Sequence, residues 1–266
     1  MKELKDKVVV ITGGATGIGY SFAKQFGAEG SKVVLAGRRM NRVDESVDEL
    51  IRLGIDATGT RCDVASEEDV KALLHYTLDF YGRVDVLINN AGVGTAQKPA
   101  YEMTPEDIRF AFDVNVFGAW NGVRVFAKHM IAQGQPCAIY NVGSENSFFN
   151  AVPQGAEYVA SKHALHAMTV ALQEDTPDFL EVGLICPGLV NSELGDGIAI
   201  GMDTDKYTAI AMEQIKAGKF YIVSHAYNMH YIEERHQLVK TAYEQYAPRY
   251  ENDQEFDVRT LMAQQG

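Results

Sequence analysis

The sequence predicts an α/β fold in which helices cover both faces of a doubly wound parallel sheet. Short β-branched apolar runs alternate with longer amphipathic stretches, the first run is followed at once by a glycine turn, and polar residues follow several later runs. Strands that alternate with helices form parallel sheets through right-handed crossovers, and these sheets bind ligands at the carboxyl ends of their strands. We therefore expect a ligand site at that edge.

The composition fits one large domain that spans residues 1–266. Of the 266 residues, 46% are hydrophobic, so the chain can bury a sizeable core. Charged residues crowd the start, and no apolar run approaches the roughly 20 residues that a membrane helix needs, so we expect a soluble, cytoplasmic protein without membrane contact. The formal charge of −12 argues against binding to nucleic-acid backbones.

The cysteines and histidines give no sign of a metal site. The cysteines are Cys62, Cys137 and Cys186. They are widely spaced, odd in number and set in or beside apolar runs, which predicts reduced core thiols and fits a cytoplasmic protein. His225, His230 and His236 lack the spacing of metal ligands, so we expect no bound metal.

The first strand and its glycine turn form a candidate dinucleotide site. Residues 7–12 predict a buried strand, and the apolar spacing that follows predicts a helix to about Glu29. Glycines let the backbone turn tightly and approach phosphates, while the free N–H groups of the following helix face the anion. The candidate cofactor-binding residues here are Gly13, Thr16, Gly17, Ile18 and Gly19.

The end of the second strand, residues 32–36, bears on the choice of dinucleotide. In dinucleotide-binding folds an acidic residue here favours the free ribose 2′-hydroxyl of NAD, whereas an arginine favours the 2′-phosphate of NADP. Gly37 occupies the place of the acid, and Arg38 and Arg39 follow it, so we expect a preference for NADP. Two alternatives stay open: the arginines begin a solvated helix, or the cofactor is NAD.

The chain then continues the alternation to its last strand. Ser66 and Thr104 are suited to cap helices, because acidic residues follow each and Pro105 fits the first helical position. The expected strands are residues 56–61, 84–88, 137–142, 182–186 and 220–223. The expected helices are residues 41–53, 66–81, 104 onward, 114–133, a segment with Tyr158 and Lys162 that ends near 175, and 203–217.

Polar residues lie close to the carboxyl ends of several of these strands. The segment Asn89-Asn90-Ala91-Gly92 follows one strand directly. Asn115 stands among apolar residues of a predicted helix, where a buried amide has either a structural or a functional role. Ser144 follows the strand of residues 137–142 and by itself is typical of a turn.

Tyr158 and Lys162 are spaced four residues apart, so on a helix they lie on one face, one turn apart. A phenol has an ordinary pKa of about 10, and a fixed neighbouring cation brings it toward the working range of a proton-transfer group. The alternative is an exposed pair, because this spacing also occurs on surface helices. The remaining motifs decide between the two.

The last part of the chain is expected to cover the site and then to form a tail. Residues 193–218 comprise a glycine-rich stretch and a helix, and such a stretch is commonly mobile and able to lie over a substrate. Residues 225–266 carry apolar side chains at helical spacing between Tyr227 and Tyr246, which predicts an amphipathic helical tail.

Four motifs together resemble the short-chain dehydrogenase/reductase family. They are T-G-G-x-x-G-I-G, N-N-A-G, Y-x-x-x-K and P-G-x-V, in that order, and the resemblance covers residues 7 to about 192. It implies a Rossmann sheet of about seven strands and a nicotinamide dinucleotide cofactor. It also implies a homodimer or homotetramer.

The resemblance implies a role for each matching residue. Tyr158 would be the acid/base, Lys162 would bind the nicotinamide ribose and lower the phenol pKa, Ser144 would hold the substrate oxygen, and Asn115 would anchor a proton-carrying water chain. Hydride would pass directly between the nicotinamide and the carbinol carbon. The further cofactor contacts implied are Asp63 and Val64 at the adenine, Asn90, Ala91 and Gly92 at the adenosine side, and Pro187, Gly188, Val190 and Ser192 at the carboxamide.

The chain departs from the family in two further places. Ser144 lies fourteen residues before Tyr158 instead of the usual thirteen, where Glu145 stands, so we expect a one-residue insertion, with Ser147 as the fallback. The helical tail is longer than in many members and is similar to that of bacterial Cα-dehydrogenases of β-aryl ethers, which favours a bulky aromatic substrate.

These observations support an NADP-preferring oxidoreductase that interconverts a small-molecule secondary alcohol and a ketone. A dinucleotide-binding regulator or scaffold is the alternative from another class, since a fold does not fix a function. An isomerase or dehydratase on the same fold is a third hypothesis.

Overall fold

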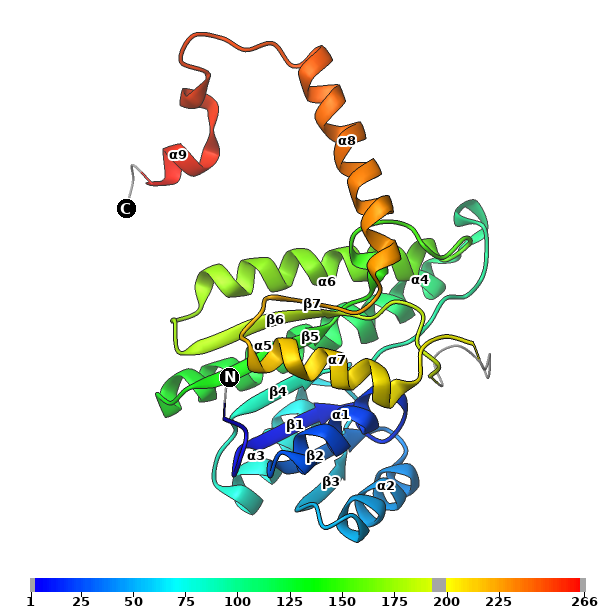
Figure 1. Ribbon diagram of the computed structural model, residues 1–266, viewed down its shortest axis with the longest axis vertical. Coiled ribbons are helices and arrows are strands. Elements are labelled where there is room, and N and C mark those ends of the chain that lie inside the picture. The colour runs from blue at the N-terminus through cyan, green and yellow to red at the C-terminus, as the bar shows by residue number, and fades with distance from the viewer. Residues whose placement is uncertain (1–2, 193–199, 264–266) are drawn as a thin grey trace. The chain divides into compact units, whose positions relative to one another are not determined.

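The computed structural model describes residues 3–192 and 200–263, and its centre is a parallel sheet of seven strands in the order β3-β2-β1-β4-β5-β6-β7 (Figure 1). The strand order reverses between β1 and β4, as it does in a doubly wound sheet. The strands are β1 (Val8–Thr12), β2 (Lys32–Gly37), β3 (Ala57–Arg61), β4 (Val86–Asn89), β5 (Cys137–Val142), β6 (Leu180–Cys186) and β7 (Tyr221–Val223). The predicted fold class is confirmed.

Helices pack on both faces of this sheet (Figure 1). One face carries α1 (Gly17–Ala28), α2 (Met40–Arg52) and α7 (Thr204–Lys216), and the other carries α3 (Glu67–Tyr81) and α5 (Gly118–Gln133). Alternate residues of β1 supply the two cores, because successive strand side chains point to opposite faces. Val9 and Ile11 pack with α1, whereas Val8 and Val10 pack with α3 and α5. The three cysteines are free and buried.

The helical region expected at residues 114–133 departs from a plain helix. It follows α4 (Pro105–Phe112) without a break, starts in a π-helical turn at Asp113–Phe117 and continues as α5. Such turns leave the regular backbone ladder and occur often at functional sites. Asn115 lies inside this one, buried to 1% exposure.

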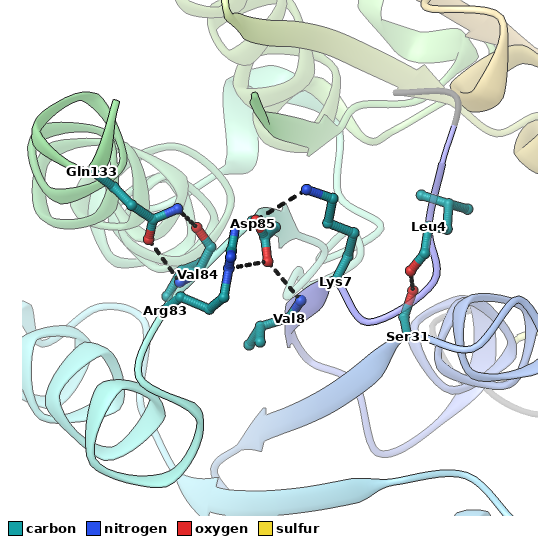
Figure 2. A network of polar contacts seen from close by, with 8 residues as sticks. All are labelled: Leu4, Lys7, Val8, Ser31, Arg83, Val84, Asp85 and Gln133. Atoms are coloured by element: carbon teal, nitrogen blue, oxygen red, sulfur yellow. Dashed lines mark hydrogen bonds and ion pairs between the residues drawn. The ribbon is translucent and has the colours of Figure 1, made fainter. Parts of the chain in front are cut away.

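A buried carboxylate, that of Asp85, connects the strands at the amino-terminal edge of the sheet. Asp85 has no exposed surface, and its oxygens accept hydrogen bonds from the backbone N–H of Val8 at 2.9 Å and from Nε of Arg83 at 2.9 Å (Figure 2). Lys7 adds an ion pair at 3.5 Å. Gln133 joins α5 to the same edge through both backbone groups of Val84, each at 3.2 Å. These bonds tie the starts of β1 and β4 together.

The chain divides into two compact units at Ala226, the second of which contains α8 (Met229–Tyr246) and α9 (Val258–Ala263). The helical tail expected at residues 225–266 falls almost wholly within this second unit. Neither helix buries a residue, and Leu238, Tyr243 and Tyr246 are 69%, 70% and 81% exposed.

The segment expected to cover the substrate, residues 193–218, is described only from residue 200. Residues 193–199 lie outside the described residues. From residue 204 the chain forms α7, whose start is bound to α1: Asp205 accepts hydrogen bonds from Ser21 and, at 2.6 Å, from Lys24. In the part of the chain described, none of the helices has the length and apolarity that crossing a membrane requires.

Candidate active site

The glycine turn after β1 leaves an open cradle for a phosphate. Gly13 has a φ of 61°, and a Cβ there would lie 2.8 Å from the Cα of Ala91. A Cβ on Gly19 would lie 2.4 Å from Nδ2 of Asn90. Thr16 is the N-cap residue of α1, but its side chain makes no capping hydrogen bond, and the first turn of the helix holds no acidic residue. The N–H groups of Gly17 and its neighbours therefore stay available to an anion. These features fit a dinucleotide pyrophosphate.

Asn90 joins this turn to the end of β4. Its Nδ2 donates to the carbonyls of Thr12 and Gly13, both at 3.0 Å, and the Thr12 hydroxyl accepts from the N–H groups of Asn90 and Ala91 at 3.0 and 3.2 Å. The predicted contacts Asn90, Ala91 and Gly92 therefore border the glycine turn. Sequence reasoning gave Thr12 no role, although it precedes the glycines directly.

The residues expected at the adenosine end lie at the carboxyl ends of β2 and β3. Arg38 and Arg39 are exposed, and Arg39 is the N-cap of α2. Asp63 is partly exposed, and its carboxylate accepts from the backbone of Ala65 at 3.1 Å. Val64 differs, because its side chain is 7% exposed and packs in the core.

Tyr158 and Ser144 meet above the end of β5. Tyr158 lies in the first turns of α6 (Ala156–Asp175), and Ser144 begins the short 3₁₀ turn η3 (Glu145–Ser147). Burial raises the pKa of the Tyr158 phenol, a hydrogen bond with Ser144 opposes this rise, and the negative charge of Glu145 adds to it. Without a cofactor, the protein therefore raises the pKa of this phenol, whereas the family resemblance implied that Lys162 lowers it.

The geometry separates Ser144 from its fallback, Ser147. Ser144 is the serine that hydrogen-bonds to Tyr158. The Oγ of Ser147 instead accepts from the backbone N–H of Ser144 at 3.2 Å, and its side chain is 1% exposed. Ser144, the serine that directly follows Gly143 after β5, is therefore the one that faces Tyr158.

Lys162 follows Tyr158 by one turn of α6 and is 5% exposed. Its Nζ donates to the carbonyl of Val142 at 2.9 Å and lies 5.7 Å from the centroid of the Tyr158 ring. Burial lowers the pKa of Lys162 to about 8. A Cβ on Gly92 would lie 3.8 Å from the same Nζ, so the ammonium lies close to one of the predicted cofactor-binding residues.

Asn115 reaches this cluster from the π-helical turn. Its Oδ1 accepts from the N–H of Val93 at 2.8 Å, and its Nδ2 donates to the carbonyl of Val93 at 3.1 Å and to Oγ of Ser161 at 3.0 Å. Ser161 in turn donates to the carbonyl of Tyr158 at 2.7 Å. Asn115 is thereby connected to the helix that carries Tyr158 and Lys162.

The loop after β6 forms the wall next to Ser144. The carbonyl of Pro187 accepts from the N–H of Glu145 at 2.8 Å, and a Cβ on Gly188 would strike the ring of His225. Val190 pairs with Met202 through a short parallel bridge. Of the four predicted carboxamide contacts, Pro187 is buried, while Gly188, Val190 and Ser192 are partly exposed.

Sequence reasoning missed two polar residues that touch the predicted catalytic groups. Ser161 contacts Asn115, and its place in Y-V-A-S-K, one helical turn from Tyr158, was a usable signal. Asn146 donates to Ser144, but nothing in the sequence distinguishes it from a turn residue. Within the described residues, no group of three or more His, Cys, Asp or Glu side chains is arranged to hold a metal ion.

Comparison with known proteins assigns the family. Residues 7–203 match the model of the short chain dehydrogenase family, so the chain belongs to the short-chain dehydrogenases/reductases. The uncharacterized oxidoreductase YxnA of Bacillus subtilis is 38% identical over 72% of this chain and 54% of its own length, so this chain spans about half of that relative. A 3alpha-hydroxysteroid dehydrogenase of Mediterraneibacter gnavus is 32% identical over 72% of this chain and 76% of its own length.

Solved structures agree with this assignment. A short chain dehydrogenase/reductase from Burkholderia phymatum, in complex with NAD, matches with a TM-score of 0.86 at 29% identity, over 94% of this chain and 100% of that one. LigD from Sphingobium sp. strain SYK-6 matches with a TM-score of 0.83 at 27% identity, over 92% and 100% of the two chains. The likeness to LigD fits the weaker resemblance to β-aryl ether Cα-dehydrogenases. Solved structures similar to this chain include one complexed with NAD and an alcohol dehydrogenase from Thermococcus sibiricus complexed with 5-hydroxy-NADP.

Proposed function

We propose that this protein interconverts a secondary alcohol and a ketone by hydride transfer, with Tyr158 as the acid/base. The observation that carries this proposal is the meeting of three groups at one edge of the sheet: the phenol of Tyr158, the hydroxyl of Ser144 and the buried ammonium of Lys162. The open glycine turn borders the same edge.

The bound nicotinamide would supply or accept the hydride, and the protein would manage one proton and one oxygen. With its raised pKa, Tyr158 is protonated at neutral pH, which is the state that donates a proton to a ketone oxygen. Ser144 would donate a second hydrogen bond to that oxygen. Lys162 would bind the nicotinamide ribose, and Asn115 would hold the water chain that returns the proton to solvent.

A preference for NADP is the second part of the proposal. Arg38 is exposed at the end of β2, where Gly37 stands in the place of the acidic residue, and a guanidinium pairs well with a phosphate. Arg38→Asp should weaken NADPH binding by about tenfold or more, as expected for loss of one charge-assisted contact, and leave NADH binding nearly unchanged. Fluorescence titration measures both dissociation constants, and equal effects on the two would contradict the preference.

A bulky aromatic substrate is the third part. The longer C-terminal unit and the likeness to LigD support it. Turnover with a panel of aliphatic, alicyclic and aryl secondary alcohols, followed at the nicotinamide absorbance with NADP⁺ and NAD⁺, tests the reaction and this class together. Higher kcat/KM for aryl alcohols is expected, whereas a preference for small aliphatic alcohols would remove this part.

The same panel separates the other hypotheses. A regulator or scaffold would bind NADPH without Tyr158-dependent turnover, and an isomerase or dehydratase would form product without a net change at the nicotinamide absorbance. A cytoplasmic location and a homodimeric or homotetrameric assembly are also part of the proposal, the latter to be tested by analytical ultracentrifugation.

A further inference from the structure

In the turn η3, Asn146 places two hydrogen-bond donors on the hydroxyl of Ser144. Asn146 is 2% exposed and Ser144 is 6% exposed. The backbone N–H and the side-chain Nδ2 of Asn146 both donate to Oγ of Ser144, each at 3.2 Å. Two donors from the same residue therefore converge on the hydroxyl that faces Tyr158.

The orientation of the Asn146 amide is fixed by a second contact. Its Oδ1 accepts from the backbone N–H of Ala151 at 2.8 Å. A backbone N–H only donates, so the oxygen must face Ala151 and the NH₂ group must face Ser144. The reversed amide would oppose donor to donor at Ala151 and lose this bond.

A serine hydroxyl has one donor and two acceptor sites. In Ser144 both acceptor sites are taken by Asn146, so the single hydroxyl proton is left to donate outward. Its partner there is the phenol of Tyr158, and the bond between them acts to lower the phenol pKa, as expected for a donor that stabilises the phenolate.

We propose that Asn146 is a positioning residue that keeps the Ser144 hydroxyl a hydrogen-bond donor to the reacting oxygen. This rests on the proposed function, in which that oxygen belongs to a ketone or an alkoxide. Both have only lone pairs to offer, so a serine that acted as an acceptor would not bind them. Asn146 thus gives a freely rotating hydroxyl the one orientation that the reaction needs.

Asn146→Asp tests this inference with a side chain of the same shape. One carboxylate oxygen keeps the bond from Ala151, but the other places an acceptor against Ser144 and captures its proton. We expect kcat to fall about 100-fold, as for loss of one donor to a developing oxyanion, with the NADPH dissociation constant unchanged. The alkaline pKa of the kcat/KM profile should rise.

Asn146→Ala separates the lost donor from the added charge. The charged groups nearest Tyr158 are Lys162 on α6 and Glu145 on η3, and both remain in this variant. The alkaline pKa should still rise, with a smaller loss of kcat. Asn150→Asp, an exposed residue of the same loop, is the matched control and should behave as wild type.

A double-mutant cycle distinguishes positioning from a general structural role. In a Ser144→Ala background Asn146→Asp should cause no further loss of kcat, because there is no hydroxyl left to orient. An equal loss in both backgrounds, or wild-type kinetics in Asn146→Asp and Asn146→Ala, would overturn the inference.

A readout without turnover keeps the inference testable if the proposed function fails. The pKa of Tyr158 can be followed by NMR of ¹³Cζ-labelled tyrosine in the protein without cofactor, with Tyr158→Phe for assignment. Asn146→Ala should raise this pKa relative to wild type, and an unchanged pKa would refute the role of Asn146. Absence of Tyr158-dependent turnover in the wild-type protein would refute only the proposed function.

Discussion

Charged groups are buried at both edges of the sheet, but the partners that surround them differ. At the amino-terminal edge Asp85 is surrounded by Arg83, Lys7 and the N–H of Val8. At the carboxyl edge Lys162 is also buried, but it donates to a neutral carbonyl, and burial lowers its pKa to about 8. Removal of one partner from a buried, paired charge is strongly destabilising, whereas a buried charge that is only solvated by a carbonyl is itself held at a cost in stability. The second kind is typical of a site that serves a ligand.

The largest change in stability is expected at the amino-terminal edge. Asp85→Asn should lower the free energy of unfolding by about 3 kcal/mol, because it removes the counter-charge of Arg83 and Lys7 and replaces one acceptor oxygen by an NH₂ group that faces other donors. Urea unfolding followed by circular dichroism measures this, with Asp79→Asn on the exposed face of α3 as the control. NADPH affinity should be unchanged at low temperature. A stability equal to wild type would mean that this edge is not held by Asp85.

At the carboxyl edge, removal of the buried charge is expected to raise the free energy of unfolding instead of lowering it. The pKa of Lys162 lies at about 8, below its ordinary 10.5, so the folded state is destabilised by the protonated form below about pH 8 and regains stability as the pH rises from there toward 10.5. Lys162→Met should therefore raise the free energy of unfolding at pH 7 by about 2 kcal/mol, at the expense of turnover. The gain should vanish above pH 10, and a loss of stability at pH 7 would contradict the comparison.

A smaller effect is expected from the carboxylate next to the site. The negative charge of Glu145 raises the pKa of Tyr158, so Glu145→Gln should move the alkaline limb of the kcat/KM profile to lower pH. Glu68→Gln, an exposed residue on α3, is the control. An alkaline limb that stays in place would show that Glu145 does not act on the phenol.

At the carboxyl edge of the sheet, the sequence predicted the main groups better than the hydrogen bonds that surround them, because only the former follow from local patterns. The glycine turn, Tyr158 and Lys162 are set by local rules, namely backbone freedom next to a strand and the spacing of one helical turn. Asn146 acts through a bond to Ala151, five residues on, whose existence depends on how the loop folds. The position of Asn115 in a π-helical turn likewise depends on its bonds to Val93, a residue of another segment.

The C-terminal part of the chain shows which features a local pattern can encode. The spacing of apolar residues predicted the helix found as α8, because amphipathic periodicity is a local property. The separation of the chain at Ala226 is not local, since it follows from how many contacts cross that point. Within the first unit, by contrast, the short β-branched run of residues 7–12 predicted the strand found as β1, whose residues pack into both cores.

The central claim is that Tyr158 transfers the proton at the carboxyl edge, and turnover of Tyr158→Phe measured beside its NADPH affinity and stability tests it most directly. The matched control is Tyr81→Phe, which removes a phenol hydroxyl bound to Asp56 away from the site. We expect kcat of Tyr158→Phe to fall by about 1000-fold, within the range for loss of a general acid, with cofactor affinity and stability near those of wild type. Turnover of Tyr158→Phe within tenfold of the Tyr81→Phe control would contradict the claim.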